Sequence, residues 1–320
     1  MVRWIPNSLM RGGYAVRRWW LSVRRDLCKN AALYFYVLPG FIVILLFNYL
    51  PMYGLQIALR DFRPAAGITG STFVGFKHFA RFFQSYQWRQ LVSNTLLLSL
   101  ESILFGFPFP ILMAIIFSQL RSKRFQRVAQ TVTYMPHFIS TVVMVGIILM
   151  FLSPNDGLYG NLVRLTGKEP QNLVGYPANF RPIYILSDIW QHSGWDSIIY
   201  MAALSAIDTQ LYDAAKVDGA SKLQRIWYID IACILPTITI LLILRLGNVM
   251  SVGFEKAYLM QNTQNLTASE VIPTYVYKVG LVNMKYSYSA AIGMMNMAIN
   301  CFLLVTVNTV AKRLDGTSLW

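Results

Sequence analysis

The sequence has few charged residues for its length, and this shortage excludes the commonest class of protein. Only 13% of its 320 residues are charged, 55% are hydrophobic, and the mean hydropathy is +0.45. A soluble globular domain typically carries about 25% charged residues. Acidic residues are the scarcest, with 14 Asp and Glu against 28 Lys and Arg. The composition therefore predicts a protein that crosses a membrane several times.

Cysteine is also rare, and its placement excludes two kinds of site. The chain has only Cys28, Cys233 and Cys301, which share no ligand-like spacing. Two of them lie in apolar stretches, so neither a disulfide framework nor a zinc site is supported, and we expect no metal site. The basic N-terminus precedes a long apolar run that lacks a small-residue cleavage site. This run predicts a membrane anchor and not a removed signal peptide.

Catalytic and nucleotide-binding motifs are missing as well. The phosphate-binding pattern G-x-x-x-x-G-K-[ST] does not occur, because Gly167-Lys168 lacks both the upstream glycine and the following hydroxyl residue. There is no H-E-x-x-H, no G-x-S-x-G and no Cys–His pairing. We therefore expect a chain that is not an enzyme and binds neither ATP nor another cofactor itself.

What the chain does contain is a series of apolar segments, each long enough for the ~20 residues that a bilayer requires. The predicted spans are residues 31–59, 91–120, 131–152, 183–207, 226–252 and 287–310. Basic residues flank these spans instead of gathering on one soluble face, so the net charge of +14 is first a topology signal and not evidence for nucleic acid. Sixteen Lys and Arg fall on the side of the termini and eleven in the intervening outer loops. This mild bias predicts that both termini are cytoplasmic.

The predicted spans divide the chain into successive regions. These are a basic cytoplasmic segment (1–30), a first transmembrane helix (31–59), an outer loop (60–90), a five-helix core (91–311) and a cytoplasmic tail (312–320).

One cytoplasmic loop, residues 208–225, has a specific pattern. Asp213-Ala214-Ala215 is expected to open a short helix, which Asp218-Gly219-Ala220 then breaks. Glycine leaves a helix through a left-handed turn without a Cβ penalty. Ser221 can cap the helix that follows, which runs directly into the fifth span. The loop is thus predicted to form an elbow of two helices whose small-residue turn lets another protein come close.

This elbow resembles the EAA loop of permease subunits in binding-protein-dependent ABC importers, whose pattern is E-A-A-x-x-D-G-A. Asp213 stands where the family usually has Glu. The Leu-Pro that commonly follows reads Ile231-Ala232, and only the later Pro236 is kept. An ordinary helical hairpin with a glycine cap is the alternative. The resemblance assigns contact with the ATPase to Asp213, Ala214, Ala215, Asp218, Gly219 and Ala220.

The resemblance runs from about residue 30 to Trp320 and implies a fold and a set of partners. The fold is an all-α integral membrane protein with six transmembrane helices and the type I ABC importer permease core, of the maltose-importer type. The implied partners are a second homologous permease, a cytoplasmic ATPase dimer that uses ATP and Mg²⁺, and an extracellular solute-binding lipoprotein. The loop at 60–90 also resembles the branch that carries complex sugars and oligosaccharides.

Polar residues inside the spans are candidates for the substrate path. A charge at the bilayer centre costs about 2.5–3.5 kcal/mol on insertion scales and normally faces a cavity or a partner. On the fourth span Asp188, His192 and Trp195 share one helical face, with Asp196 at its edge. Glu101 and Arg245 lie at a similar depth on other spans. Indole rings can stack on sugars, and charged groups bond strongly to hydroxyls, so this layer is expected to line a sugar path.

The same residues have structural explanations. Arg245 can pair with Glu101 or Asp188 and merely hold helices together, and Trp195 can belong to an interfacial belt. If Arg245 does meet substrate, a buried guanidinium below basic outer loops favours an anion such as a uronic-acid-containing oligosaccharide. Loop charge can equally dock an acidic binding protein. Two other classes stay open at this point: an ATP-independent carrier or channel, and a membrane enzyme or scaffold.

Overall fold

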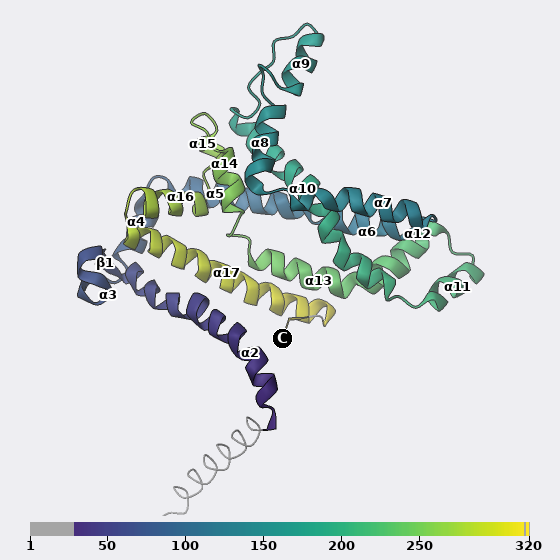
Figure 1. Cartoon of the computed structure of the whole chain (residues 1–320), viewed down its shortest axis with the longest axis horizontal. Helices are drawn as coiled ribbons and strands as arrows, with labels where there is room; N and C mark the ends of the chain where they lie inside the picture. The colour runs from purple at the N-terminus through teal and green to yellow at the C-terminus, as the bar shows by residue number, and fades with distance from the viewer. Residues whose placement is uncertain (1–28, 317, 320) are drawn as a thin grey trace, which may run out of the picture. The chain divides into compact units, whose positions relative to one another are not determined.

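The computed structural model describes residues 29–316, 318 and 319, most of which are helical (Figure 1). The predicted N-terminal segment, residues 1–30, lies outside the described residues except for its last two positions. The chain divides into two units, Met1–Gln56 and Ile57–Trp320, and each is considered separately.

The described part of the first unit belongs to an apolar helix, whose last three residues are the first of the second unit. It begins as α2 (Ala31–Ile44), continues as the π-helical turn η1 (Leu45–Tyr49) and ends in the 3₁₀ segment η2 (Leu50–Leu59). The continuous helical run of 29 residues matches the predicted first span at both ends. None of the side chains of α2 is buried.

A small hairpin opens the second unit where the sequence predicted only a polar outer loop. Strand β1 (Arg60–Arg63) pairs antiparallel with β2 (Ser71–Phe73), and η3 (Pro64–Ala66) and α3 (Gly67–Gly70) form the connection. The next helix, α4 (Lys77–Gln84), is tied to the hairpin by an ion pair of 2.8 Å between Lys77 Nζ and Asp61 Oδ2. The hydrogen bond from Lys77 holds the pKa of Asp61 below its ordinary value.

The second span is continuous but irregular. It consists of α5 (Trp88–Glu101), the π-helical turn η4 (Ser102–Gly106) and α6 (Pro108–Ser118). Pro108 and Pro110 lack an amide hydrogen and would interrupt regular hydrogen bonding, and the π-helical turn lies immediately before them. The sequence placed this span correctly and its prolines marked the irregular point.

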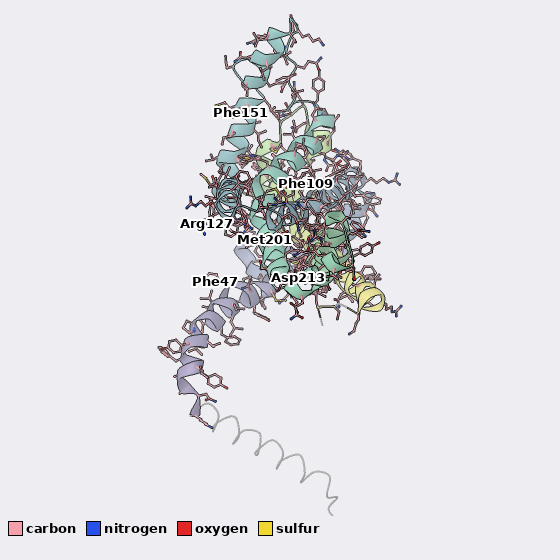
Figure 2. All side chains as sticks on the ribbon, turned by 90° about the vertical axis from the view of Figure 1, so that its right-hand side faces the viewer. Phe47, Phe109, Arg127, Phe151, Met201 and Asp213 are labelled. Atoms are coloured by element: carbon pink, nitrogen blue, oxygen red, sulfur yellow. The ribbon has the colours of Figure 1, made fainter. Side chains whose placement is uncertain are left out.

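The predicted third span is not one straight helix. It is made of α7 (Lys123–Tyr134), the 3₁₀ turn η5 (Met135–Phe138) and α8 (Thr141–Phe151), and the two helical parts meet at 98°. Ser140 restarts the helix by accepting a hydrogen bond from the Val143 amide. Figure 2 shows α8, which carries Phe151, pointing away from the bundle. Ile139 and Ser140 have extended backbones, which divide the predicted third span, 131–152, into two helical parts.

The longest element of the fourth region is α10 (Pro177–Ser205), with 29 residues. At ~1.5 Å per residue it is about 43 Å long, enough to cross a bilayer. Pro177 occupies its first helical position, so the helix begins earlier than the predicted 183 and includes Arg181, which the sequence had placed in an outer loop. Before it, the outer segment contains only the short helix α9 (Leu158–Leu165).

After α10 the chain forms the elbow and the last two long helices. The elbow helices α11 (Thr209–Val217) and α12 (Lys222–Arg225) precede the π-helical η6 (Ile226–Ile231) and α13 (Ala232–Gly247). The final helix is α17 (Tyr286–Asp315). In Figure 1 the elbow lies at one end of the bundle, and β1, α3 and α4 lie at the other.

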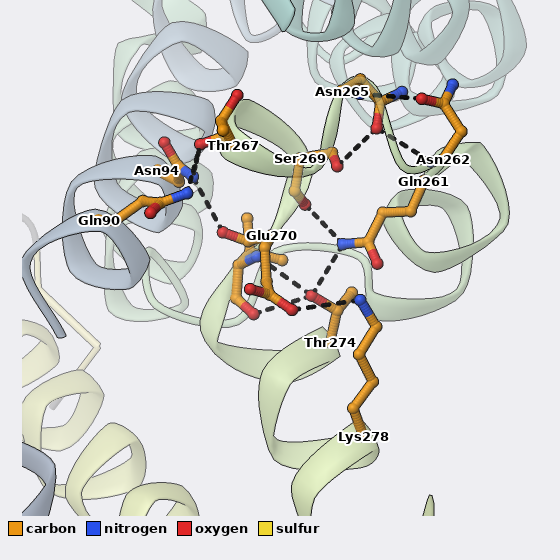
Figure 3. Close-up of polar contacts among 11 residues, drawn as sticks. Gln90, Asn94, Gln261, Asn262, Asn265, Thr267, Ser269, Glu270, Thr274 and Lys278 are labelled. Atoms are coloured by element: carbon orange, nitrogen blue, oxygen red, sulfur yellow. Dashed lines mark hydrogen bonds and ion pairs between the residues drawn. The ribbon is translucent and has the colours of Figure 1, made fainter. Parts of the chain in front are cut away.

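The connection between α13 and α17 was predicted as an outer loop but is largely helical. It contains α14 (Phe254–Met260), α15 (Leu266–Ser269), α16 (Ile272–Tyr277) and the π-helical η7 (Lys278–Val282). Side-chain amides fix this connection to α5 (Figure 3). Asn94 donates hydrogen bonds to the Thr267 and Glu270 carbonyls at 2.8 and 3.0 Å, and Gln90 donates to Thr267 at 2.8 Å. These bonds hold the connection as part of the bundle.

Within the described residues, four helices are long and apolar enough to cross a membrane: 31–59, 88–118, 222–247 and 286–313. The bent pair of α7 and α8 would make a fifth. α10 is not in this set although it is long enough, because Arg181, Asp188 and Asp196 make it too polar. The six predicted spans thus correspond to these four helices, the bent pair and α10.

One contact shows how closely α7 and α10 approach. A Cβ added to Gly194 would lie 2.1 Å from the Thr133 carbonyl oxygen of α7, a distance that no real contact allows. Glycine is therefore needed at this position by packing and not by backbone conformation.

We expect Gly194→Ala to destabilise the protein by about 1–3 kcal/mol, because the added methyl group forces α7 and α10 apart. The measurement is the unfolding temperature in detergent. Gly146→Ala is the matched control, since a Cβ at Gly146 would meet nothing within 4 Å. The control should be neutral or slightly stabilising. Equal melting temperatures for the two variants would contradict the close contact.

Candidate functional site

Asp188, His192 and Asp196 are three of the four predicted path residues on α10. The two carboxylates among them contact cations from other helices. Asp188 Oδ1 lies 3.3 Å from the Lys256 ammonium of α14 and 3.3 Å from Nδ1 of His192, one turn along α10. One turn further, Asp196 Oδ2 lies 3.8 Å from Nη1 of Arg245 on α13. The helical spacing of 188, 192 and 196 therefore produces a row of charged and polar groups in space.

The predicted partners of Arg245 were wrong. Its nearest carboxylate is Asp196, and neither Glu101 nor Asp188 pairs with it. Glu101 instead accepts a hydrogen bond of 2.6 Å from Nη1 of Arg181, which the early start of α10 brings within reach. Asp188 is held by Lys256. Each of the two expected partners thus has a cation that the sequence had placed in an outer loop.

Trp195 belongs to an aromatic cluster and is not an isolated belt residue. The His137 ring of η5 stacks on it with centroids 4.6 Å apart and an angle of 3° between the ring planes. His137 also meets the His192 ring edge-on at 5.5 Å. Trp190, by contrast, is 55% exposed. The break in the third segment therefore places η5 against the path residues of α10.

A cavity of about 460 Å³ lies beside this row. Asp188 and Tyr184 of α10 line it together with Ser99 and Ser102 of the second span and Arg245 of α13. A smaller cavity of about 160 Å³ is lined by Asp196, Tyr200 and again Arg245. A volume of several hundred cubic ångströms is typical of sites for small ligands. Arg245 lines both cavities.

The structure therefore brings most of the predicted path residues together, and leaves one apart. Asp188, Asp196 and Arg245 line the cavities, His192 contacts Asp188, and Trp195 belongs to the ring cluster with His137 and His192. Glu101 lines neither cavity and is engaged by Arg181. Among the described residues, no three His, Cys, Asp or Glu side chains come together as metal ligands. The hydroxyl, carboxylate, guanidinium and indole groups present suit a polar, hydroxylated ligand.

Three contributors were missed from the sequence. These are His137, Lys256 and Arg181, and the two cations fall in predicted outer loops. The signal for Lys256 was its position in Phe254–Met260, where flanking apolar residues make a buried helical turn possible. The signal for Arg181 was Pro177, a favoured first residue of a helix.

The elbow has the geometry that its sequence predicts at the turn. Gly219 has φ +76°, and its amide donates to the Lys216 carbonyl at 3.1 Å while the Ala220 amide donates to the Ala215 carbonyl at 2.8 Å. These two bonds define a Schellman motif. Ser221 caps the next helix in a reciprocal capping box with Gln224.

One detail of the elbow differs from expectation. The first helix begins at Thr209, capped by Asp208, so Asp213 lies within the helix and does not open it. The side chain of Asp208 accepts a bond from the Gln210 amide at 2.9 Å, a capping signal that the sequence offered.

A buried carboxylate anchors the elbow to the bundle. Asp230 of η6 is fully buried, and its Oδ1 accepts a hydrogen bond of 2.5 Å from the Tyr212 hydroxyl of α11. Its Oδ2 accepts one of 3.1 Å from Gln119 Nε2, just after α6. Burial, together with this bond to a carboxylate, raises the pKa of Tyr212. Large apolar side chains are exposed on the elbow and at the start of η6: Val217, Leu223, Trp227 and Tyr228.

Comparison with known proteins relates the whole chain to one family. A family model described as the binding-protein-dependent transport system inner membrane component matches residues 106–316. The polygalacturonan/rhamnogalacturonan transport system permease protein YteP of Bacillus subtilis (strain 168) is 41% identical over 294 residues, which cover 92% of each protein. The arabinooligosaccharides transport system permease protein AraP of the same organism is 25% identical over 98% of this chain and 95% of its own length.

A solved structure gives the same relation. One chain of a bacterial ABC transporter involved in the import of the acidic polysaccharide alginate superposes with a TM-score of 0.85 and 39% identity. The match covers 93% of this chain and 99% of that one. The fold described above is therefore that of a permease in an importer of this kind.

We expect Tyr212→Phe to loosen the elbow, because it removes one of the two bonds to the buried Asp230 carboxylate. A hydrogen bond to a charged group contributes about 1.5 kcal/mol or more, so amide hydrogen exchange in α11 should accelerate roughly tenfold. Tyr228→Phe is the control, since the Tyr228 side chain is 73% exposed. Unchanged exchange in Tyr212→Phe would show that the anchor contributes nothing to the elbow.

Proposed function

Because the chain belongs to the family of binding-protein-dependent transport system inner membrane components, we propose that it forms part of the membrane path for acidic oligosaccharides. The protein is a membrane-embedded permease subunit of an ABC sugar importer and is not an enzyme. Membership of this family excludes the alternatives, which were an ATP-independent carrier, a channel and a membrane enzyme or scaffold.

Six transmembrane helices with both termini in the cytoplasm are the topology that we propose. In it, the first helix is 31–59, 60–90 is the outer loop, 91–311 is the core, and the cytoplasmic tail is 312–320. The third crossing is the bent pair of α7 and α8, and α10 is the fourth although it is polar. Placement of the elbow and of the β1 hairpin at opposite ends of the bundle supports this arrangement (Figure 1).

The subunit works with partners in our proposal. These are a second homologous permease, a cytoplasmic ATPase dimer that uses ATP and Mg²⁺, and an extracellular solute-binding lipoprotein. The family is named for a binding protein, and a related solved alginate transporter is in complex with a periplasmic protein that holds an alginate pentasaccharide. Both facts support a binding-protein partner for this chain.

The observation that carries the substrate proposal is the position of Arg245. Arg245 lines both cavities, and its contact with Asp196 is 3.8 Å, much longer than the 2.6 Å between Arg181 and Glu101. A guanidinium held this loosely keeps donors for a substrate carboxylate, which it binds as a two-pronged fork. The transported acids would be uronic-acid-containing oligosaccharides, in keeping with the polygalacturonan and alginate systems to which the chain is similar.

The outer loops add less free positive charge than the sequence suggested. Lys256 is buried, and Lys77 and Lys278 are paired with Asp61 and Glu270 at 2.8 and 3.2 Å. The acidic preference therefore depends on Arg245 in the path more than on a basic vestibule above it.

Transport would follow from rigid-body movement. Asp188, His192, Trp195, Asp196 and Arg245 would guide the sugar along α10, by hydrogen bonds to hydroxyls and by stacking. Closure of the ATPase dimer would push on the elbow through Asp213, Ala214, Ala215, Asp218, Gly219 and Ala220. Because α12 runs without interruption into α13, a movement of the elbow would also move α13, which carries Arg245. This movement would open the substrate path to one side of the membrane and then to the other.

We expect Arg245→Gln to reduce uptake of an acidic oligosaccharide by about tenfold or more, because the carboxylate loses a charged two-pronged donor. Uptake of a neutral oligosaccharide of equal length should change much less. The measurement compares the two in the complete importer, with equal amounts of assembled protein. Equal loss of both would make Arg245 a structural residue, and no loss would remove it from the path.

We expect Gly219→Val to abolish transport and substrate-stimulated ATP hydrolysis while the protein still inserts. Valine strains the positive φ of the turn and adds bulk where the ATPase would dock. Gly167→Val is a closely matched control, because Gly167 has φ +75° and, like Gly219, open space around its Cβ position, but lies in the outer segment. Wild-type transport by Gly219→Val would exclude the elbow as the coupling element.

A further inference from the structure

Lys256 is a buried cation whose surroundings are fixed by two residues of α10. Its side chain is only 6% exposed, and its ammonium lies 3.3 Å from Asp188 Oδ1 and 4.8 Å above the centre of the Tyr184 ring. Both distances fit stabilising contacts of an ammonium, with a carboxylate and with an aromatic face. Lys256 is not among the residues that line the 460 Å³ cavity. It touches two residues that do line it, Asp188 and Tyr184, and pairs with Asp188 by charge.

Asp188 has the opposite character, because part of its carboxylate faces the cavity. Its side chain is 27% exposed and lines the same cavity as Arg245. Oδ1 receives both Lys256 and His192. The other oxygen, Oδ2, has no bond to any residue that the structure describes and is therefore available to accept a bond from a ligand hydroxyl.

A carboxylate on the wall of an anion path raises a physical difficulty. Two like charges that approach in a partly dehydrated cavity repel strongly, so a bare Asp188 would oppose the passage of a uronic acid. The Lys256 charge cancels that of Asp188 at short range. The cavity then presents Arg245 as its attractive group, and Asp188 as a hydrogen-bond acceptor without net repulsion.

We propose that Lys256 is a positioning residue for selectivity: by neutralising Asp188 from behind, it allows carboxylated sugars to pass a carboxylate that also binds sugar hydroxyls. This inference rests on the proposed function of acidic oligosaccharide import. Two turns along α10, about 12 Å away, Arg245 of α13 accompanies Asp196, but this contact of 3.8 Å is longer and leaves Arg245 with donors for the substrate.

The test uses the complete importer reconstituted in liposomes, with its partner permease, ATPase and binding protein. The probes are a galacturonic acid oligomer and its methyl ester, which has the same length and no charge. Each variant is described by its ratio of acid uptake to ester uptake relative to wild type, so that any preference of the binding protein cancels. Lys256→Met keeps the length of the side chain but removes its charge.

We expect Lys256→Met to lower the acid-to-ester ratio at least tenfold, because Asp188 becomes an uncompensated negative charge facing the substrate. Adding Asp188→Asn to that variant removes the charge and should restore the ratio to within about threefold of wild type. Lys256→Arg should retain the wild-type ratio, since the positive charge is kept. A purely structural role would lower both uptakes together, and the second substitution would then leave the ratio unchanged; that result overturns the proposal.

Two further outcomes are decisive. If Lys256→Met does not assemble, the double variant is compared directly with wild type. Selective loss of acid uptake in the double variant would mean that Lys256 binds the substrate carboxylate itself, which overturns the neutralising role. If the wild type takes up ester as readily as acid, the proposed acidic substrate is wrong. A fall in the ratio on Lys256→Met would still support the effect of Lys256 on Asp188.

Discussion

The need to compensate charge away from water organises this protein more than any other constraint. An ionised side chain in a membrane interior is expensive unless a partner or a cavity receives it. α10 carries two carboxylates and a histidine on one face, and each carboxylate has a cation from a different element. Because α13 and α14 pack beside α10, Arg245 and Lys256 reach Asp196 and Asp188. The same packing therefore also compensates the charges of the two carboxylates.

The sequence predicted features that depend on local chemistry. The apolar lengths placed the spans, and Gly219 with Ser221 specified a turn whose hydrogen bonds the structure shows in full. The shared face of 188, 192 and 195 followed from helical periodicity alone. In each case the responsible residues lie within a few positions of one another, so no knowledge of tertiary structure was required.

Features that depend on contacts between distant segments were predicted less well. The bend of 98° between α7 and α8 required knowing that Ile139 and Ser140 would leave the helical conformation in an apolar region. Pairing of Asp188 with Lys256 joins residues 68 positions apart, across a connection that looked like a loop. Ion pairs are assigned wrongly from sequence when several cations compete for a few acids, and this chain has twice as many basic as acidic residues.

The attachment of the elbow has a mechanical consequence. An element joined to a body at one point can pivot, whereas an element joined at two points transmits rotation as well as displacement. α11 follows α10 after a short connection and is joined to η6 by the bond from Tyr212 to Asp230. A force on α11 therefore acts on α10 and on the helix that contains α13 at the same time. The two helices that carry Asp196 and Arg245 would turn together. The two cavities that Arg245 lines would therefore change shape at the same time.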